Sequence, residues 1–285
     1  MEKNVGETAR SGVVKVLEGT KEAAVGVVDV VTATTVKAIE GVKDVGTSLS
    51  GILVSTISGA IKATGEIGGN VTTVATSSIV GALKGVHEVA TVTTDVVSDT
   101  VRGAIKGTAD IGGDVASVAK GAIVGAILGT RDIAVSSEAA AAEAAKGVIR
   151  AVSEVGTDAG LAAKNAVKGA IGGVAETSGN LTSVIKETTK GLVLATAEVG
   201  GDAAAISKNA VVGVIEAAKE IGLSAEAAAS AAATGATEAA ETIGGETASA
   251  VRKAVTGTIA GIKVVVKEPF RTEKEEVHTS DRRVA

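Results

Sequence analysis

Apolar and polar residues follow one another along this chain with a period of eleven. Similar segments recur every 44 residues, and they begin at Gly59, Gly103, Gly147, Gly191 and Gly235. Each of these blocks divides into four elevens, and the same frame covers residues 4–267 without insertion or deletion, as 24 successive elevens. Eleven residues make three helical turns at about 3.67 residues per turn. The pattern therefore predicts helix throughout this range.

Charged residues follow the same frame. Residues 4–267 contain 50 Asp, Glu, Lys and Arg residues, and 48 of them occupy positions 1, 4, 7, 8 and 11 of the elevens; only Glu138 and Glu226 depart. On a helical wheel these five positions form one polar arc, and the other six form an apolar arc. The apolar arc is expected to face a surface. Its larger members include Ile61, Ile67, Leu83, Val89, Ile105, Ile111, Ile127 and Ile133.

We expect an all-α protein, built from one long amphipathic helix or from several that lie side by side in an assembly. Three junctions have the order of a helix-ending glycine followed by an N-cap residue, namely 68–70, 112–114 and 200–202. They could be turns. The unbroken frame favours flexible joints or close-packing points instead, because loops between packed helices normally shift the phase. A continuous helix of this span would measure about 400 Å at 1.5 Å per residue. The expected organisation is a leader (1–3), the repeat region (4–267) and a charged tail (268–285).

The polar arc has two sides of opposite charge. Positions 7 and 11 form a basic flank, which includes Lys21, Lys43, Lys120, Arg131, Lys164 and Lys186. Positions 8 and 1 form an acidic flank, which includes Glu22, Glu66, Glu88, Asp110, Asp132 and Glu154. Parallel neighbours would bring a basic flank against an acidic one, whereas antiparallel neighbours would match like charges. The sorting therefore predicts parallel helices, from neighbouring copies or from successive turns of one wound helix. The alternative is that the charged flanks serve only to keep the helix soluble.

Composition narrows the possible functions. The chain has 37 glycines and no cysteine, tryptophan or tyrosine, and Phe270 is its one aromatic residue, so a thick globular core is not expected. Glycines four residues apart, such as Gly81 and Gly85, would let helices approach closely. His87 and His278 stand far apart, and the carboxylates repeat with the helix. We therefore expect no enzymatic activity, no catalytic residue, no metal site, no cofactor and no small-molecule substrate.

Net charge and hydropathy bear on location and partners. The net charge of -5 argues against nucleic acid as a partner. The first residues do not resemble a signal peptide, and the uncharged stretch at 45–61 contains too much Ser, Thr and Gly for a bilayer span. A cytoplasmic location, peripheral to a membrane or inclusion, is expected.

The elevens carry a family likeness. VLEGTKEAAVG at 16–26, AIEGVKDVG at 38–46 and ALKGVHEVA at 82–90 resemble the repeats of synucleins and perilipins. This resemblance implies a coat on a membrane, lipid droplet or inclusion, with partners that are the lipid surface and other copies of the chain. The alternative is a protein-only scaffold, a tube, filament or shell whose apolar faces close on each other as in coiled coils. A weaker alternative is a desiccation or stress protectant.

Overall fold

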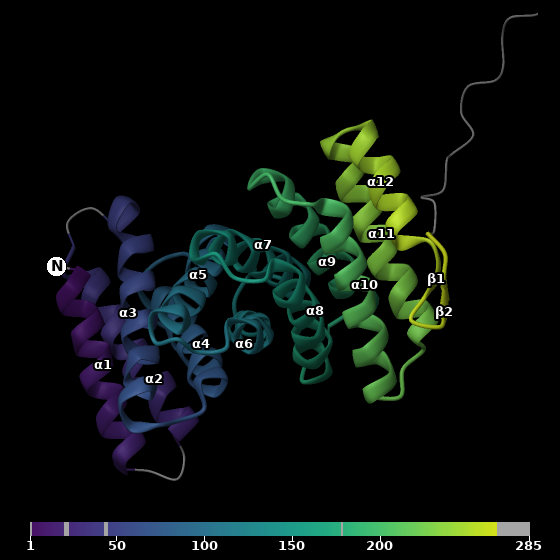
Figure 1. Cartoon of the computed structure of the whole chain (residues 1–285). Coiled ribbons are helices and arrows are strands. Elements are labelled where there is room, and N and C mark those ends of the chain that lie inside the picture. Colours follow the sequence, from purple (N-terminus) through teal and green to yellow (C-terminus); the bar gives the residue numbers. More distant parts are fainter. Residues whose placement is uncertain (1, 20–22, 43–44, 178, 267–285) are drawn as a thin grey trace, which may run out of the picture.

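The computed structural model describes residues 2–19, 23–42, 45–177 and 179–266, and most of them are helical (Figure 1). The helices run, in chain order, α1 Glu2–Gly19, α2 Ala23–Glu40, α3 Val45–Ile67, α4 Val71–Val89, α5 Thr94–Asp110, α6 Val115–Gly129, α7 Ser137–Val155, α8 Ala159–Ala175, α9 Leu181–Glu198, α10 Ala203–Glu220, α11 Ala225–Ile243 and α12 Gly245–Val255. Two short strands follow, β1 Gly257–Ile259 and β2 Ile262–Val264. The all-α prediction is confirmed, and the helices pack side by side within one chain.

The glycine junctions are turns. Gly68, Gly112 and Gly200 adopt left-handed φ values of 70°, 66° and 72°, which a residue with a β-carbon rarely adopts. Two residues later, the side chains of Asn70 and Asp114 each accept a hydrogen bond from a backbone N–H at the start of the next helix. The preference for joints within a continuous helix is therefore wrong, and the longest helix of the described chain, α3, has 23 residues.

The turns leave the phase intact because helix and turn together fill two elevens. From α6 to α11 the helices begin at residues 115, 137, 159, 181, 203 and 225, a constant interval of 22. Two such units form an antiparallel hairpin of four elevens, which is the longer period of the sequence. The structural unit is thus the helix with its turn, and no turn delimits a single eleven.

The helices form two layers. From α1 to α11, each helix makes its most extensive contacts with the helix two places away in the chain, so odd-numbered helices stack on one another and even-numbered helices do the same (Figure 1). Stacked helices are parallel, because Gly103 and Gly107 of α5 lie against Val54 and Ser58 of α3, in the same order along both helices. Stacked helical hairpins of this kind make a solenoid.

A row of glycines makes the close stacking possible. We call it the glycine row; its members recur at every second eleven as Gly59, Gly81, Gly103, Gly125, Gly147, Gly169, Gly191, Gly213 and Gly235. A β-carbon on Gly147 would lie 2.7 Å from the carbonyl oxygen of Ser98 in the helix beneath, and the other members meet the backbone in the same way. The expectation that Gly81, Gly85, Gly103 and Gly107 admit close approach is confirmed.

Hydroxyl groups cross the same interfaces. Thr32 and Thr76 donate hydrogen bonds to the carbonyl oxygens of Gly81 and Gly121, at 3.0 and 2.9 Å. Ser58 donates similarly to Gly103 at 3.0 Å. Each bond joins a helix to the one stacked on it, which is possible only because glycine brings the two backbones together. Small apolar and hydroxyl side chains thus replace the bulky core residues that the composition lacks.

The C-terminal end of the stack, where α12 packs on α10 and α11, is also covered by a β hairpin. Strands β1 and β2 pair antiparallel, and their side chains Ile259 and Val264 are buried against the helices. β2 contacts α11, and the Lys219 ammonium of α10 donates to the carbonyl oxygen of Ala260 in the hairpin turn at 3.4 Å. The last helix pair is therefore shielded by a different kind of element.

Candidate interaction surface

The apolar arc is buried inside the chain. Ile61, Leu83, Ile105 and Ile127 are fully buried between the two layers of helices. Val89, Ile111 and Ile133 are partly buried against the same core, and Ile67 is half-buried at the end of α3. These residues were expected to face an external surface, and that expectation is wrong for this structure. The turns fold the apolar arc of each helix onto its neighbours, so the chain covers its own apolar face.

The outer face of the stack carries ion pairs between parallel helices. In the odd layer the pairs are Arg10 with Glu66, Lys62 with Asp110, Arg102 and Lys106 with Glu154, Arg150 with Glu198, and Lys186 with Glu238. In the even layer, Lys164 and Lys168 pair with Glu216, and Lys168 also pairs with Glu220. Each pair joins a base on one helix to an acid on the next helix in the same layer. We call this series the ion-pair ladder.

The flank residues have several different environments. Glu66, Asp110, Glu154, Lys164 and Lys186 belong to the ion-pair ladder. Arg131 and Asp132 contact each other at 3.5 Å in the turn after α6. Lys120 and Glu88 are exposed and make no ion pair with any described residue. Lys21, Lys43 and Glu22 lie outside the described residues.

Two acids of the ladder hold their charge more strongly than usual. Burial raises the pKa of Glu154, but hydrogen bonds from Lys106 and Arg102 outweigh it and leave this pKa below its ordinary value. The pKa of Glu216 is lowered for the same reasons, with Lys164 and Lys168 as donors. The hydrogen bond to Glu216 in turn raises the pKa of Lys168. These contacts therefore favour the charged forms of Glu154, Glu216 and Lys168.

Burial has the opposite net effect at Asp99. It raises the pKa of this carboxyl group, although a hydrogen bond from Ser50 and the charge of Arg102 act against it. Asp99 is a half-buried residue of α5, and the Ser50 hydroxyl that donates to it comes from α3. Within the described chain no base or nucleophile is paired with it in a cavity, so its environment is that of a structural acid.

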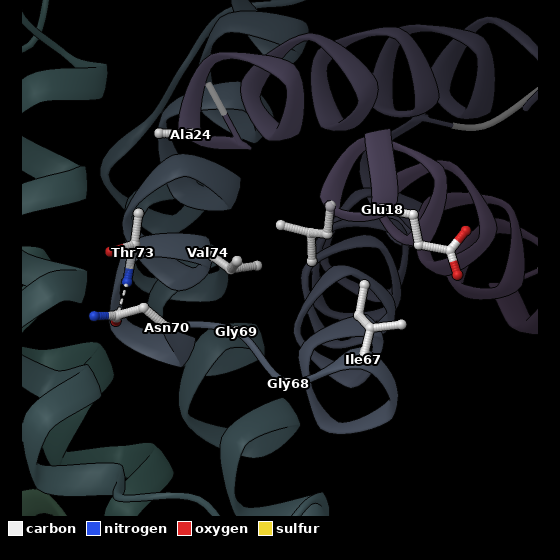
Figure 2. A pocket seen from close by; sticks show the side chains of 9 residues that line it. Glu18, Ala24, Ile67, Gly68, Gly69, Asn70, Thr73 and Val74 are labelled. Atoms are coloured by element: carbon white, nitrogen blue, oxygen red, sulfur yellow. Dashed lines mark hydrogen bonds between the residues drawn. The ribbon is translucent and has the colours of Figure 1, made fainter. Parts of the chain in front are cut away.

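One cavity of about 420 Å³ lies where the first two helical hairpins meet (Figure 2). It is lined by Leu17, Glu18, Ala24, Ile67, Gly68, Gly69, Asn70, Thr73 and Val74. The Asn70 side chain accepts a hydrogen bond from the backbone N–H of Thr73, and the carboxylate of Glu18 points away from both residues (Figure 2). The lining therefore brings no acid and base together, and it offers little to orient a ligand.

The described part of the chain has no group of three His, Cys, Asp or Glu residues that could hold a metal ion. None of the described helices is long and apolar enough to cross a membrane. His87 is exposed at the end of α4, and His278 lies beyond the described residues. What remains as a candidate for interaction is the surface itself, with its ion-pair ladder, its turns and its ends.

Some apolar side chains do remain exposed at the ends of helices. Val199, Ile221 and Ile243 follow or end α9, α10 and α11, and their exposed fractions are 39%, 52% and 36%. Leu161, at the start of α8, is exposed at the same edge as Val199 and Ile243, and Leu223, before α11, is exposed at the opposite edge with Ile221. The two layers place these residues at the turns rather than on one flat face.

The chain matches no protein-family model, and no curated protein matches its sequence.

Proposed function

We propose that this protein is a non-enzymatic structural scaffold, a self-contained stack of helices that presents charged outer faces and two ends to other protein molecules. The observation that carries the proposal is the burial of the apolar arc. Ile61, Leu83, Ile105 and Ile127 have no exposed surface, and each fully buried side chain of this size contributes about 1.5–3 kcal/mol. The core therefore needs no lipid or partner to complete it.

A lipid surface would have to compete with this packing. A helix that turned its apolar arc to a membrane would exchange one apolar environment for another, with little gain. It would also lose the glycine-row contacts, the hydroxyl bonds of Thr32, Ser58 and Thr76, and its rungs of the ion-pair ladder. These losses favour the protein-only scaffold over a coat in which the helices leave the stack and lie on the lipid surface.

A second candidate keeps the stack intact and uses its turns. Leu161, Val199 and Ile243 are exposed at the same edge of the stack, where α8 begins and α9 and α11 end, and they could enter the outer part of a bilayer or lipid droplet to a shallow depth. The resemblance of the elevens to synucleins and perilipins supports this candidate. It predicts binding without any change in helix content, because the helices are already formed.

Circular dichroism and vesicle flotation of the full chain separate these possibilities. The scaffold predicts a strongly helical spectrum in buffer, no gain of helix with phosphatidylcholine or phosphatidylserine vesicles, and no flotation. A chain with little helix that gains it on vesicles would overturn the proposal. Flotation of an already helical protein, abolished in a Leu161→Ser, Val199→Ser and Ile243→Ser variant, would favour the second candidate.

A further inference from the structure

The N-terminal end of the stack exposes one face each of α1 and α2, with no helix stacked on it from the described chain (Figure 1). We call this the N-terminal end face. On α1 its exposed residues include Thr8, Ser11 and Lys15, and on α2 and directly after it they include Val25, Asp29, Ala33, Lys37 and Gly41. At 59%, Val25 is the most exposed large hydrophobic side chain among the described residues.

Lysines take the place of glycine on this face. Lys15 and Lys37 stand four elevens, or 44 residues, before Gly59 and Gly81 of the glycine row. Within the stack, those glycines touch the backbone of a parallel helix beneath. A lysine side chain prevents such an approach. Another helix therefore cannot lie on this face in the parallel arrangement that holds the rest of the stack together.

The charges of this face have no partners within the described chain. Lys15, Asp29 and Lys37 make no ion pair there, in contrast to the charges of the ladder. Asp29, Ala33 and Lys37 are spaced four residues apart, so they form one stripe along α2. The acid lies toward the start of the helix and the base toward its end. Such a stripe complements a second copy of itself when the two run antiparallel.

The geometry points to a symmetric dimer through the N-terminal end face, with α2 antiparallel to α2 of a second copy and Ala33 on the two-fold axis. In this arrangement Asp29 of each copy faces Lys37 of the other, because the two residues lie equally far from Ala33 on either side. Val25 of each copy faces Gly41 of the other for the same reason, and Gly41 has no side chain to obstruct it. Each contact occurs twice, as an isologous interface requires.

The small side chain of Ala33 suits the axis, where the two helices come closest. On α1, Ser11 lies at about the same height in the hairpin and is also small, so the neighbouring helix does not obstruct the approach. The ion pairs set the antiparallel direction, and burial of Val25 adds apolar contact. The contact adds a partner to the scaffold, and the scaffold function does not depend on it.

Charge reversal and charge exchange test this dimer in the full chain by light scattering and sedimentation. The wild type is expected to dimerise. Lys37→Asp places two acids opposite each other twice, and it should weaken the dimer at least about tenfold. The exchange Asp29→Lys with Lys37→Asp restores opposite charges across the axis and should restore the dimer. Lys120→Asp, on an exposed part of α6, is the matched control and should change nothing.

Cysteine cross-linking gives an independent measurement, since the chain has no cysteine of its own. Ala33→Cys brings two thiols together at the axis, and mild oxidation should convert most of the protein to a covalent dimer. Ala205→Cys, at an exposed position of α10, should cross-link far less. A wild type that stays monomeric at high concentration overturns the inference. The inference is also overturned if Lys37→Asp leaves the dimer as strong as in the wild type. The same holds if the Ala33→Cys variant does not cross-link although circular dichroism shows that it is folded.

Discussion

Gly169 of α8 lies so close to the carbonyl oxygen of Lys120 in α6 that a β-carbon at residue 169 would overlap this oxygen. Three residues later in the same helix, a β-carbon on Gly172 would meet nothing within 4 Å. The two residues are both glycines of α8, but they differ in what they face. One of them belongs to the glycine row, and the other faces open space.

The first prediction follows from this difference. Gly169→Ala forces α6 and α8 apart and should lower the free energy of unfolding by about 1–3 kcal/mol. Gly172→Ala is the matched control, and it should raise this free energy by about 0.5–1 kcal/mol because alanine favours helix. Urea unfolding followed by circular dichroism measures both. Equal effects of the two substitutions would show that the helices are not stacked as described.

Much of the fold could be predicted from the sequence. The 11-residue period predicts helix and correctly identifies Ile61 and Leu83 as belonging to an apolar face. It does not distinguish a face covered by lipid from one covered by the next helix, because both demand the same side chains. The sorting of charge predicts parallel neighbours with basic against acidic flanks, and the structure has such neighbours in the ion pairs of Lys164 and Lys186 within one chain.

The turns could not be predicted from phase. A loop normally shifts the frame, but here each helix and turn together fill two elevens, so the elevens pass through the turns unchanged. The signal lay instead in the first position of each eleven. From Gly103 to Gly235 that position alternates between members of the glycine row and residues that accept a hydrogen bond at a helix start, for example Gly103, Asp114, Gly125 and Ser136. Two alternating roles at one position indicate a unit of two elevens.

Helix caps provide a second prediction. The Asp158 side chain accepts a hydrogen bond from the backbone N–H of Leu161 at 3.0 Å, at the start of α8. Asp158→Ala removes this bond and should lower the free energy of unfolding by about 1 kcal/mol. Thr93 precedes α5 but makes no side-chain bond there, so Thr93→Ala should have a much smaller effect. Thermal unfolding of both variants makes the comparison, and a similar loss from each would contradict the capping role.

A third prediction concerns a buried hydroxyl group. Thr35 is fully buried in α2, and its hydroxyl has no hydrogen-bond partner among the described residues. Burying an unpaired hydroxyl costs about 1–3 kcal/mol, so Thr35→Val should raise the free energy of unfolding by about 1 kcal/mol. Thr56 is also fully buried, but it donates to the carbonyl oxygen of Ile52 at 2.8 Å. Thr56→Val should therefore not raise the free energy of unfolding. In urea unfolding, the midpoint should rise for Thr35→Val but not for Thr56→Val.

The ion-pair ladder makes stability depend on pH in the acid range. The pKa values of Glu154 and Glu216 in the folded protein lie below the ordinary glutamate value of 4.5. The folded state therefore binds fewer protons than the unfolded state as the pH approaches these values. The contribution is fully present above pH 4.5, and it is lost as the pH falls through the lowered pKa values. Both side chains are 36% exposed, so solvent screening limits each contribution to about 0.5 kcal/mol.

The double variant Glu154→Gln with Glu216→Gln tests this dependence. The variant should be less stable than the wild type at pH 7, by about 1 kcal/mol or less, and the difference should shrink toward zero at pH 3. Glu88→Gln serves as the control, because Glu88 makes no ion pair with a described residue, and its stability should follow that of the wild type at both pH values. Urea unfolding at the two pH values gives the comparison. A difference that persists unchanged at pH 3 would mean that the two glutamates act through packing, since a protonated carboxyl group can no longer pair with Lys106 or Lys168.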